Sequence, residues 1–558
     1  MLNFIHIFTE DSWDGLLQNG LFREGDGLKV MQINYRPPHL QFNQLAAIGG
    51  KLDRLLTELR CPFYIDRLEG GLPLPHLYRY SEELLAHYCT LLGNNFWGFQ
   101  MHEWSSNYRS DYQRLKELYT RLGTPDPTPG ERDAIFAKIR SKEEYLLLEA
   151  MTPAEWSSHR DPINRAMFLD DLRLLYECRS HMTGHRMIPA DSYHMAPRIE
   201  IENGANLLLP EVGWQIPGTR MQLAYTRGMA RAADIRWGVY YECWCYNTKA
   251  GHLMIPYSLR EGEDECGDGW CRSPWYTPWT PEEREIAGTS FNLQERLWRY
   301  AYHSGATVLA EEWGVCNTFR DYHDYDLSIY GQTKRDFLRY TERHPEPGTP
   351  FTPIAVVLPA ELPVFDVLLR DNYLDYPTDD TSYVVTDETT ARIRTGMEVL
   401  FGHDGRGNTG KILRCGGFPD VFDILHADQE EALSGYDYLI DLTGNDRFAA
   451  SHDNIVTPQA LDPILDRILP CRIGGDLHTA YNRTENGFTV LVLNNDGVTN
   501  DNFEGDTYLP DAAVTEPVRF CGGYHSCCVL DGTGAVHTDG DAVTLTLGAG
   551  EWLLLGIS

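Results

Sequence analysis

The stretch Asn95-Phe-Trp-Gly-Phe-Gln-Met-His-Glu103 says more about the fold than any other segment of this chain. A helical pattern over Ser81–Leu92 and a short polar turn come before it. The apolar run Phe96–Phe99 is too short and too aromatic for a helix, which predicts a buried strand. Because His102 and Glu103 close the run, the segment predicts a strand that carries a glutamate to its own C-terminal end.

A second segment, Arg236-Trp-Gly-Val-Tyr-Tyr-Glu242, has the same design far along the chain. When parallel strands close into a barrel, their C-terminal ends meet at one face, which is where barrel proteins hold acid–base groups. The two segments therefore indicate a pair of carboxylates, Glu103 and Glu242, at one end of a barrel.

Short apolar segments alternate with amphipathic helices up to about residue 345. This order implies a parallel sheet, and eight such units imply a closed (β/α)8, or TIM, barrel of the α/β class over residues 1–345. The predicted strands are Asn3–Phe8, Lys29–Tyr35, Pro62–Arg67, Phe96–Glu103, Met187–Tyr193, Asn206–Trp214, Arg236–Trp244 and Ala306–Trp313. The predicted helices are Gln44–Leu59, Ser81–Leu92, Asp111–Leu122, Arg165–His181, Met221–Ala233 and Phe291–His303.

Polar residues end one predicted strand after another. A strand buried between a barrel interior and its helices is expected to be apolar. Polar ends on many strands therefore indicate a functional face, although each one alone is also explained as a capped strand end. The candidates for ligand contact are Arg36, Asp66, His102, Glu211 and Glu312.

A segment rich in Pro and Gly, His344–Pro350, predicts the end of the barrel. Residues 350–470 continue with strand and helix patterns, which predict a smaller, doubly wound, Rossmann-like α/β domain. Residues 471–558 are all-β in pattern and predict a small C-terminal β-sandwich. The strands expected in these two domains are Pro353–Pro359, Asp420–Ile424, Tyr436–Asp441, Phe488–Asn494, Val543–Gly548 and Glu551–Gly556.

The chain is acidic, with 48 basic and 81 acidic residues and a net charge of −33. This charge argues against nucleic acid and anionic membranes as partners, because both require basic patches. We see no apolar run of membrane-spanning length and no signal peptide, so a cytoplasmic location is expected. Aromatic residues make up 12% of the chain, and sugar-binding clefts use such rings as stacking platforms.

The 13 cysteines are scattered and odd in number, which suits a reducing compartment. Five of them lie in one region, but their spacing lacks the C-x2-C pair of a standard zinc site. A structural zinc ion remains conceivable there, and buried free thiols are the preferred interpretation. We expect no metal and no cofactor. The five residues are Cys243, Cys245, Cys266, Cys271 and Cys316.

The segments Trp97–Glu103 and Arg236–Glu242 resemble those of the retaining (β/α)8 glycoside hydrolases. The chain looks most like the three-domain β-galactosidase-type enzymes of family 42, whose fourth strand reads G-W-Q-x-D-N-E. The resemblance implies cleavage of a β-glycosidic bond, with Glu103 as general acid/base and Glu242 as nucleophile. It also implies an oligosaccharide or glycoside substrate and a homotrimer assembled through the Rossmann-like domain. His102 stands where the family has an Asn that holds the sugar 2-hydroxyl.

Several alternatives stay open at this point. A strand count shifted by one would make Glu211 or Glu312 the nucleophile. A noncatalytic carbohydrate-binding protein on a degenerate barrel is the second hypothesis, and a metal-dependent hydrolase the third, although the chain lacks the clustered His residues that the third requires. The aromatic residues expected to form subsite walls are Trp104, Trp214, Tyr241, Trp244 and Trp313.

Overall fold

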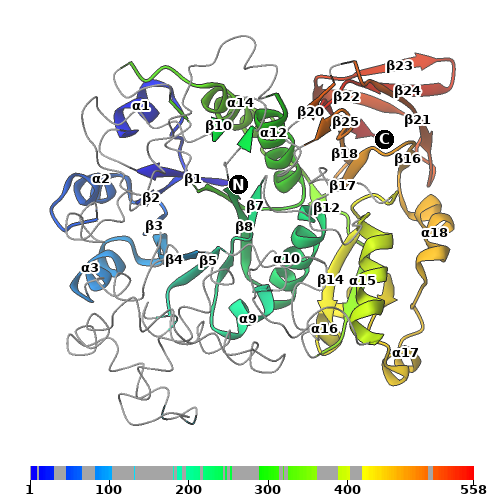
Figure 1. The fold of residues 1–558 in the computed structure, drawn as a ribbon, viewed down its shortest axis with the longest axis horizontal. Helices are drawn as coiled ribbons and strands as arrows, with labels where there is room; N and C mark the ends of the chain where they lie inside the picture. Colours follow the sequence, from blue (N-terminus) through cyan, green and yellow to red (C-terminus); the bar gives the residue numbers. More distant parts are fainter. Residues whose placement is uncertain are drawn as a thin grey trace.

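A computed structural model describes the backbone of most of the chain (Figure 1). At some of these residues, among them His102 and Glu242, it describes the main chain only. The described residues are 2–8, 12–30, 46–65, 82–102, 128, 131, 180, 185–190, 196–213, 218–242, 246–247, 252–253, 288–312, 318–319, 324–360, 388–402, 417–499, 507–509 and 511–558.

A nearly closed barrel of parallel strands forms the first part of the protein, and its eight strand positions follow the order of the sequence. β6 and β7 share one position, because both pair in parallel with β8. Every predicted barrel strand is therefore present, in its predicted place. The strands are β1 (Asn3–Phe8), β2 (Gly27–Val30), β3 (Phe63–Ile65), β4 (Phe96–His102), β5 (Met187–Ala190), β6 (Leu207–Leu208), β7 (Glu211–Gly213), β8 (Arg236–Glu242) and β11 (Val308–Glu311).

The barrel interior is filled by a separate cluster of buried side chains. Its members come from strands all around the sheet and form one cluster separate from the outer layer, so they point into the barrel. The residues between them on each strand pack outward against the helices. The interior cluster consists of Ile5, Tyr64, Ile188, Ala190, Leu207, Leu209, Tyr240, Val308 and Ala310, with Trp97 packed against it.

Helices cover the outside of the barrel (Figure 1). Four predicted helices are present, although α10 and α12 begin a few residues earlier than expected and α2 begins later. The predicted helices at 111–122 and 165–181 lie outside the described residues, except for Ser180. The helices of this part are α1 (Ser12–Gln18), α2 (Lys51–Leu59), α3 (Glu82–Leu92), α9 (Ala196–Glu202), α10 (Thr219–Ala233), α12 (Gly288–His303) and α14 (Ile329–Arg343).

A small parallel sheet follows, with the strand order β14-β13-β15. This order places the first strand of the unit at the centre, and the predicted strands at 353–359, 420–424 and 436–441 are all present. The elements are β13 (Ile354–Leu358), α15 (Glu388–Phe401), β14 (Phe422–His426), α16 (Glu430–Leu433), β15 (Tyr438–Asp441), α17 (Asp446–Ser451) and α18 (Leu461–Ile468).

Two larger antiparallel sheets form most of the C-terminal part. One has the order β12-β17-β18-β25-β22, and the other has the order β16-β21-β24-β23. β12 (Thr349–Pro350) precedes the small parallel sheet in the sequence but pairs with β17, so the predicted boundary segment is itself part of a C-terminal sheet. The remaining strands of these two sheets are β16 (Cys471–Ile473), β17 (His478–Thr484), β18 (Gly487–Leu493), β21 (Val514–Phe520), β22 (Cys527–Gly532), β23 (Ala535–Asp539), β24 (Ala542–Leu547) and β25 (Trp552–Ile557). A third, two-stranded sheet consists of β19 (Val498–Thr499) and β20 (Thr507–Tyr508).

The barrel and the small parallel sheet meet where α10 packs on β14 (Figure 1). Gly228 makes this approach possible, because a Cβ atom there would lie 2.4 Å from the carbonyl oxygen of Ile424. Near the start of the helix, Arg220 pairs with Asp420 at 2.6 Å, and both side chains are buried. Burial favours a raised pKa for Asp420, but its pairing with Arg220 and His478 outweighs burial and holds the pKa below its usual range.

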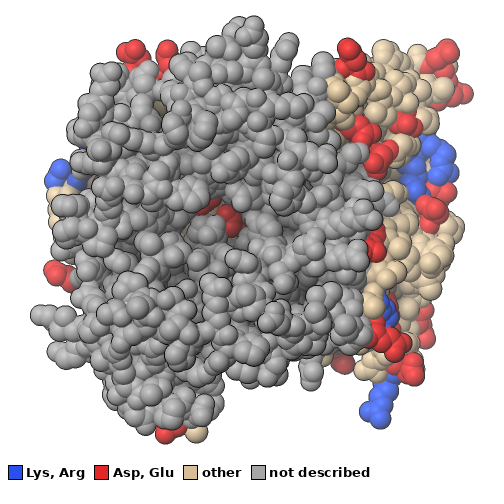
Figure 2. All heavy atoms as spheres, in the orientation of Figure 1, with Lys and Arg blue, Asp and Glu red and all other residues tan. Residues whose placement is uncertain are grey.

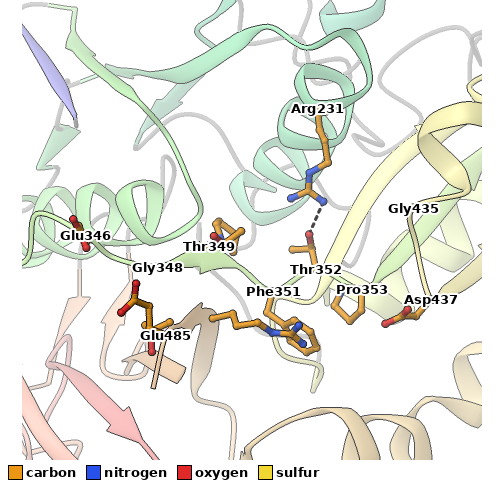
Figure 3. Close-up of a pocket in the computed structure, with 13 residues that line it drawn as sticks. Arg231, Glu346, Gly348, Thr349, Phe351, Thr352, Pro353, Gly435, Asp437 and Glu485 are labelled. Atoms are coloured by element: carbon orange, nitrogen blue, oxygen red, sulfur yellow. Dashed lines mark hydrogen bonds between the residues drawn. The ribbon is translucent and has the colours of Figure 1, made fainter. Parts of the chain in front are cut away.

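A cavity of about 770 Å³ lies at the junction of the three parts. Figure 3 shows Arg231 reaching from α10 toward Thr352, to which it donates a hydrogen bond of 3.0 Å. Arg231 lies near the C-terminal end of α10, and α10 runs antiparallel to the barrel strands. The cavity is therefore at the end of the barrel where the strands begin. Among the described residues, no helix has the length and apolar composition needed to cross a membrane.

Candidate active site at the C-terminal ends of the barrel strands

The parallel pairing of the barrel strands brings all their C-terminal ends to one face. Figure 2 shows Asp or Glu side chains near the middle of the view, over the region where Figure 1 places β7 and β8. Acidic side chains therefore gather where neighbouring barrel strands end.

Three neighbouring strands, β7, β8 and β11, each end at or near a glutamate. In the sheet register, Glu211 lies opposite Tyr240, and Gly213 lies opposite Glu242, the last residue of β8. The amide of Glu312 donates to the carbonyl oxygen of Tyr241 at 2.8 Å, directly after β11. Because paired strands lie about 4.8 Å apart, Glu242 and Glu312 start from adjacent strand ends at similar heights, and Glu211 starts two residues lower on the neighbouring strand.

Helix α10 contacts the main chain of Glu211 on the outer side of the barrel. Its side chain is buried, with 2% exposure. Its carbonyl oxygen accepts a 2.9 Å hydrogen bond from the buried amide of Gln222. Val212 packs in the outer layer with the helices, so the alternation of strand residues directs Glu211 toward the barrel interior. This placement keeps Glu211 a candidate for the site.

The consecutive residues Glu311 and Glu312 have different surroundings. Glu311 is buried and pairs with Lys334 of α14 at 2.5 Å, on the outer face of the barrel. Lys334 also donates to Thr318 at 2.7 Å, which ties this ion pair to the helix layer. Ala310 belongs to the interior cluster. Alternation therefore directs the buried Glu312 inward, and Glu311 has a structural role.

A further group of bonded polar side chains lies in the same outer layer, next to β1. His6 bonds to Asp26 at 3.3 Å, and both side chains are buried. Burial lowers the pKa of His6 despite the opposing effect of Asp26. Asp26 also pairs with Arg23 at 3.1 Å. These groups pack on the side of the strands that faces away from the barrel interior, so they brace the site without entering it.

Lys29 is a charged residue of the barrel interior that was not among the predicted site residues. Its side chain on β2 is fully buried. Its ammonium donates to the carbonyl oxygen of Glu311 at 2.6 Å and to the Tyr240 hydroxyl at 3.2 Å. The available signal was a lone charge in the apolar run Leu28–Val30, because a strand covered on both faces is expected to be apolar.

The aromatic residue Tyr241 lies in a different environment from the one predicted. It is fully buried, and its ring meets Trp298 of α12 edge-on at 5.6 Å between centroids. This packing belongs to the interface between the barrel and its helices, and it gives no support to a sugar contact.

The other predicted site residues are placed only in part. His102 is the last residue of β4, and Glu103 follows it directly, outside the described residues. Among the described side chains, no group of three or more His, Cys, Asp or Glu residues is arranged to hold a metal ion. Also outside the described residues are Arg36, Asp66, Trp104, Trp214, Trp244, Trp313 and the five clustered cysteines.

Comparison with known proteins gave no match to a protein-family model and none to a curated protein. Among solved structures, the chain is similar to the catalytic module of a family 98 glycoside hydrolase from Streptococcus pneumoniae TIGR4. The identity is 11% and the TM-score 0.44, with 100% of this chain and 99% of that chain covered.

Two further solved structures are similar at the same low level. For a polyextremophilic β-galactosidase from the haloarchaeon Halorubrum lacusprofundi, the identity is 9% and the TM-score 0.40, with coverage of 99% and 98%. For an exo-β-1,4-mannosidase from Opitutaceae bacterium strain TAV5, the values are 11% and 0.35, with coverage of 94% and 90%. Similarity at this level does not by itself define the activity of this chain.

Proposed function

We propose that the protein is a retaining glycoside hydrolase that cleaves a β-glycosidic bond, with Glu103 as general acid/base and Glu242 as nucleophile. One observation carries the proposal: Glu103 directly follows the fourth strand of a parallel barrel, and Glu242 ends the seventh. Glycosidic cleavage requires two carboxyl groups on either side of one bond, and strand ends of one barrel face can supply them.

The reaction has two steps. First, the carboxylate of Glu242 attacks the anomeric carbon while Glu103 donates its proton to the departing oxygen, which leaves a glycosyl ester on Glu242. Then Glu103, now a carboxylate, takes a proton from water as the water attacks the same carbon, which releases the sugar and restores both residues. Two inversions give a product of retained configuration.

The substrate class follows from the same resemblance and from the charge of the chain. We infer an exo-acting, β-galactosidase-like enzyme on a neutral glycoside, because a net charge of −33 disfavours anionic polymers. The resemblance also supports a homotrimer. A monomeric mass by light scattering at micromolar concentration would contradict the trimer and leave the hydrolase proposal intact.

A panel of chromogenic β-glycosides is the first test of activity. If the wild-type protein hydrolyses none of them but binds sugars in calorimetry, a noncatalytic carbohydrate-binding protein becomes the better explanation. If it hydrolyses one, two variants then assign the roles of the glutamates.

With Glu242→Ala, turnover should be lost, and azide should restore part of it with a glycosyl azide of inverted configuration. With Glu103→Ala, a dinitrophenyl glycoside should still form the intermediate, and azide should give a product of retained configuration. Glu58→Ala, at an exposed position of α2, is the matched control and should keep full activity. The same azide product from both variants would overturn the assignment.

A further inference from the structure

We propose that Lys29 is a positioning residue of this site, which fixes the ends of β8 and β11 at the heights that catalysis requires. This inference rests on the proposed function. Lys29 is on β2, and β1 separates β2 from β11 in the sheet order. Its side chain therefore reaches across the interior to two strands that it does not pair with.

The contacts of the Lys29 ammonium are specific. It donates to the carbonyl oxygens of Glu311 at 2.6 Å and Glu312 at 3.3 Å, and to the hydroxyl of Tyr240 at 3.2 Å. An ammonium has three N–H donors, and the described residues offer one oxygen for each. It also lies 4.6 Å from the centre of the Tyr240 ring, a favourable cation–π arrangement.

These contacts act on the main chain from which the candidate carboxylates start. The amide of Glu312 already donates to Tyr241 of β8, so the end of β11 is tied to β8 through its N–H group. Lys29 ties the same peptide segment to β2 through its carbonyl oxygens. Tyr240 lies two residues before Glu242, the last residue of β8. One ammonium thus connects the strand ends that carry Glu242 and Glu312.

A role in packing alone does not explain a lysine at this position. Burying an ammonium costs several kcal/mol unless hydrogen bonds and charges compensate. Leu28 and Val30, its neighbours on β2, are apolar and fill the outer layer. An apolar side chain would fill the interior at position 29 without the desolvation cost. The charge is therefore explained by the strand ends of β8 and β11 that the ammonium holds in place. Their position matters because a displacement of about 1 Å at a catalytic group reduces turnover about 100-fold.

The test uses the full-length protein and the variant Lys29→Met, with Lys51→Met in α2 as the control at a less buried lysine. On the best chromogenic glycoside, Lys29→Met should lower kcat by about 100-fold while KM changes little. Hydrogen–deuterium exchange should become faster in the peptide that contains Glu311 and Glu312, and should stay unchanged in a peptide from β14. The control should match wild type in both measurements.

The two readouts separate this inference from the proposed function. Faster local exchange in a protein that hydrolyses no glycoside would support the positioning role and remove the hydrolase proposal. Normal kcat in an active enzyme, or unchanged exchange near Glu312, would overturn the positioning role. If Lys29→Met does not fold, Lys29→Gln keeps a neutral donor at the same place and is measured in the same way. Equal losses of kcat and of global stability, without a local change in exchange, would mean that Lys29 is only structural.

Discussion

The carboxylate of Asp423 on β14 lies 2.6 Å from Nε of Arg227 on α10, and both side chains are almost completely buried. The second oxygen of Asp423 pairs with Arg231 at 2.6 Å and accepts hydrogen bonds from Thr352 and Tyr436. This one side chain therefore joins the helix that follows the sixth barrel strand to the small parallel sheet. Asp423 therefore fixes how α10 of the barrel packs on β14 of the small parallel sheet.

The Asp423→Asn variant tests the strength of this contact. It removes the charge that compensates the buried Arg227, so we expect a loss of about 3–5 kcal/mol in the free energy of unfolding. Urea denaturation followed by fluorescence measures the loss. Asp453→Asn, at an exposed position, should be neutral. A loss below about 1 kcal/mol for Asp423→Asn would show that the ion pair does not fix the contact.

Gly228→Ala separates helix propensity from packing. Propensity alone predicts a gain of about 1 kcal/mol, because Ala is the better helix former. The added Cβ would lie 2.4 Å from the carbonyl oxygen of Ile424, so we expect a net loss instead. Gly435→Ala, whose Cβ would meet only the Ala432 carbonyl at 3.3 Å, is the control. A stabilised Gly228→Ala protein would mean that α10 and β14 can move apart at little cost.

Stability should fall as the pH is lowered from about 6.5 toward 4, because several histidines, among them His303 and His426, are buried as neutral groups. Burial lowers the pKa of His303 to about 3 and that of His426 to about 4. The unfolded chain takes up these protons near pH 6.5, whereas the folded protein does not, and each pKa unit of difference corresponds to about 1.4 kcal/mol. The stabilisation is therefore present above pH 6.5 and is lost as the pH falls toward these folded-state pKa values.

Melting temperatures between pH 7 and pH 4.5 measure this effect. His303→Gln should flatten the dependence on pH, whereas His537→Gln, at an exposed position on β23, should leave the slope as it is. The explanation fails if the wild-type melting temperature is constant over this range.

The distance between the catalytic carboxyl groups is a direct structural test. If Glu103 and Glu242 form a retaining pair, their carboxyl carbons should lie about 5–5.5 Å apart in a crystal structure, whereas an inverting pair requires about 6.5–9.5 Å. A separation beyond about 10 Å would exclude Glu242 as the nucleophile. Glu312→Gln and Glu211→Gln would then identify the nucleophile, because its loss should abolish turnover and the other substitution should only reduce it.

The positions of the barrel strands could be predicted because each is a short apolar run that ends in polar residues. The residues at which the strands begin and end were less predictable. β2 begins at Gly27, two residues before the predicted start at Lys29, because pairing with β1 extends through Gly27. The sixth predicted strand is divided into β6 and β7 around Leu209 and Pro210. Proline lacks the N–H group that a continuous ladder needs.

The roles of individual charged residues depended on contacts that are distant in sequence. Glu311 and Glu312 look equivalent in the sequence, and the structure separates them by the inward position of Ala310 and by the ion pair of Glu311 with Lys334 of α14. Tyr241 was predicted to be one of the aromatic subsite walls, but it packs against Trp298 of α12, because adjacent residues on a strand point to opposite faces. Lys29 was missed because its partners are the main-chain oxygens of a strand far along the chain.

The pairing of β12 with β17 has a consequence for how the protein is made. β12 leaves the ribosome with the end of the barrel, whereas its partner β17 and the last strand, β25, are synthesised only after the small parallel sheet. Trp552 of β25 in turn covers Arg299 of α12 at 4.0 Å and donates to Glu295. Helix α12 therefore gains this contact only after β25 has been synthesised, so the nascent barrel lacks part of its outer packing while the small parallel sheet is being made.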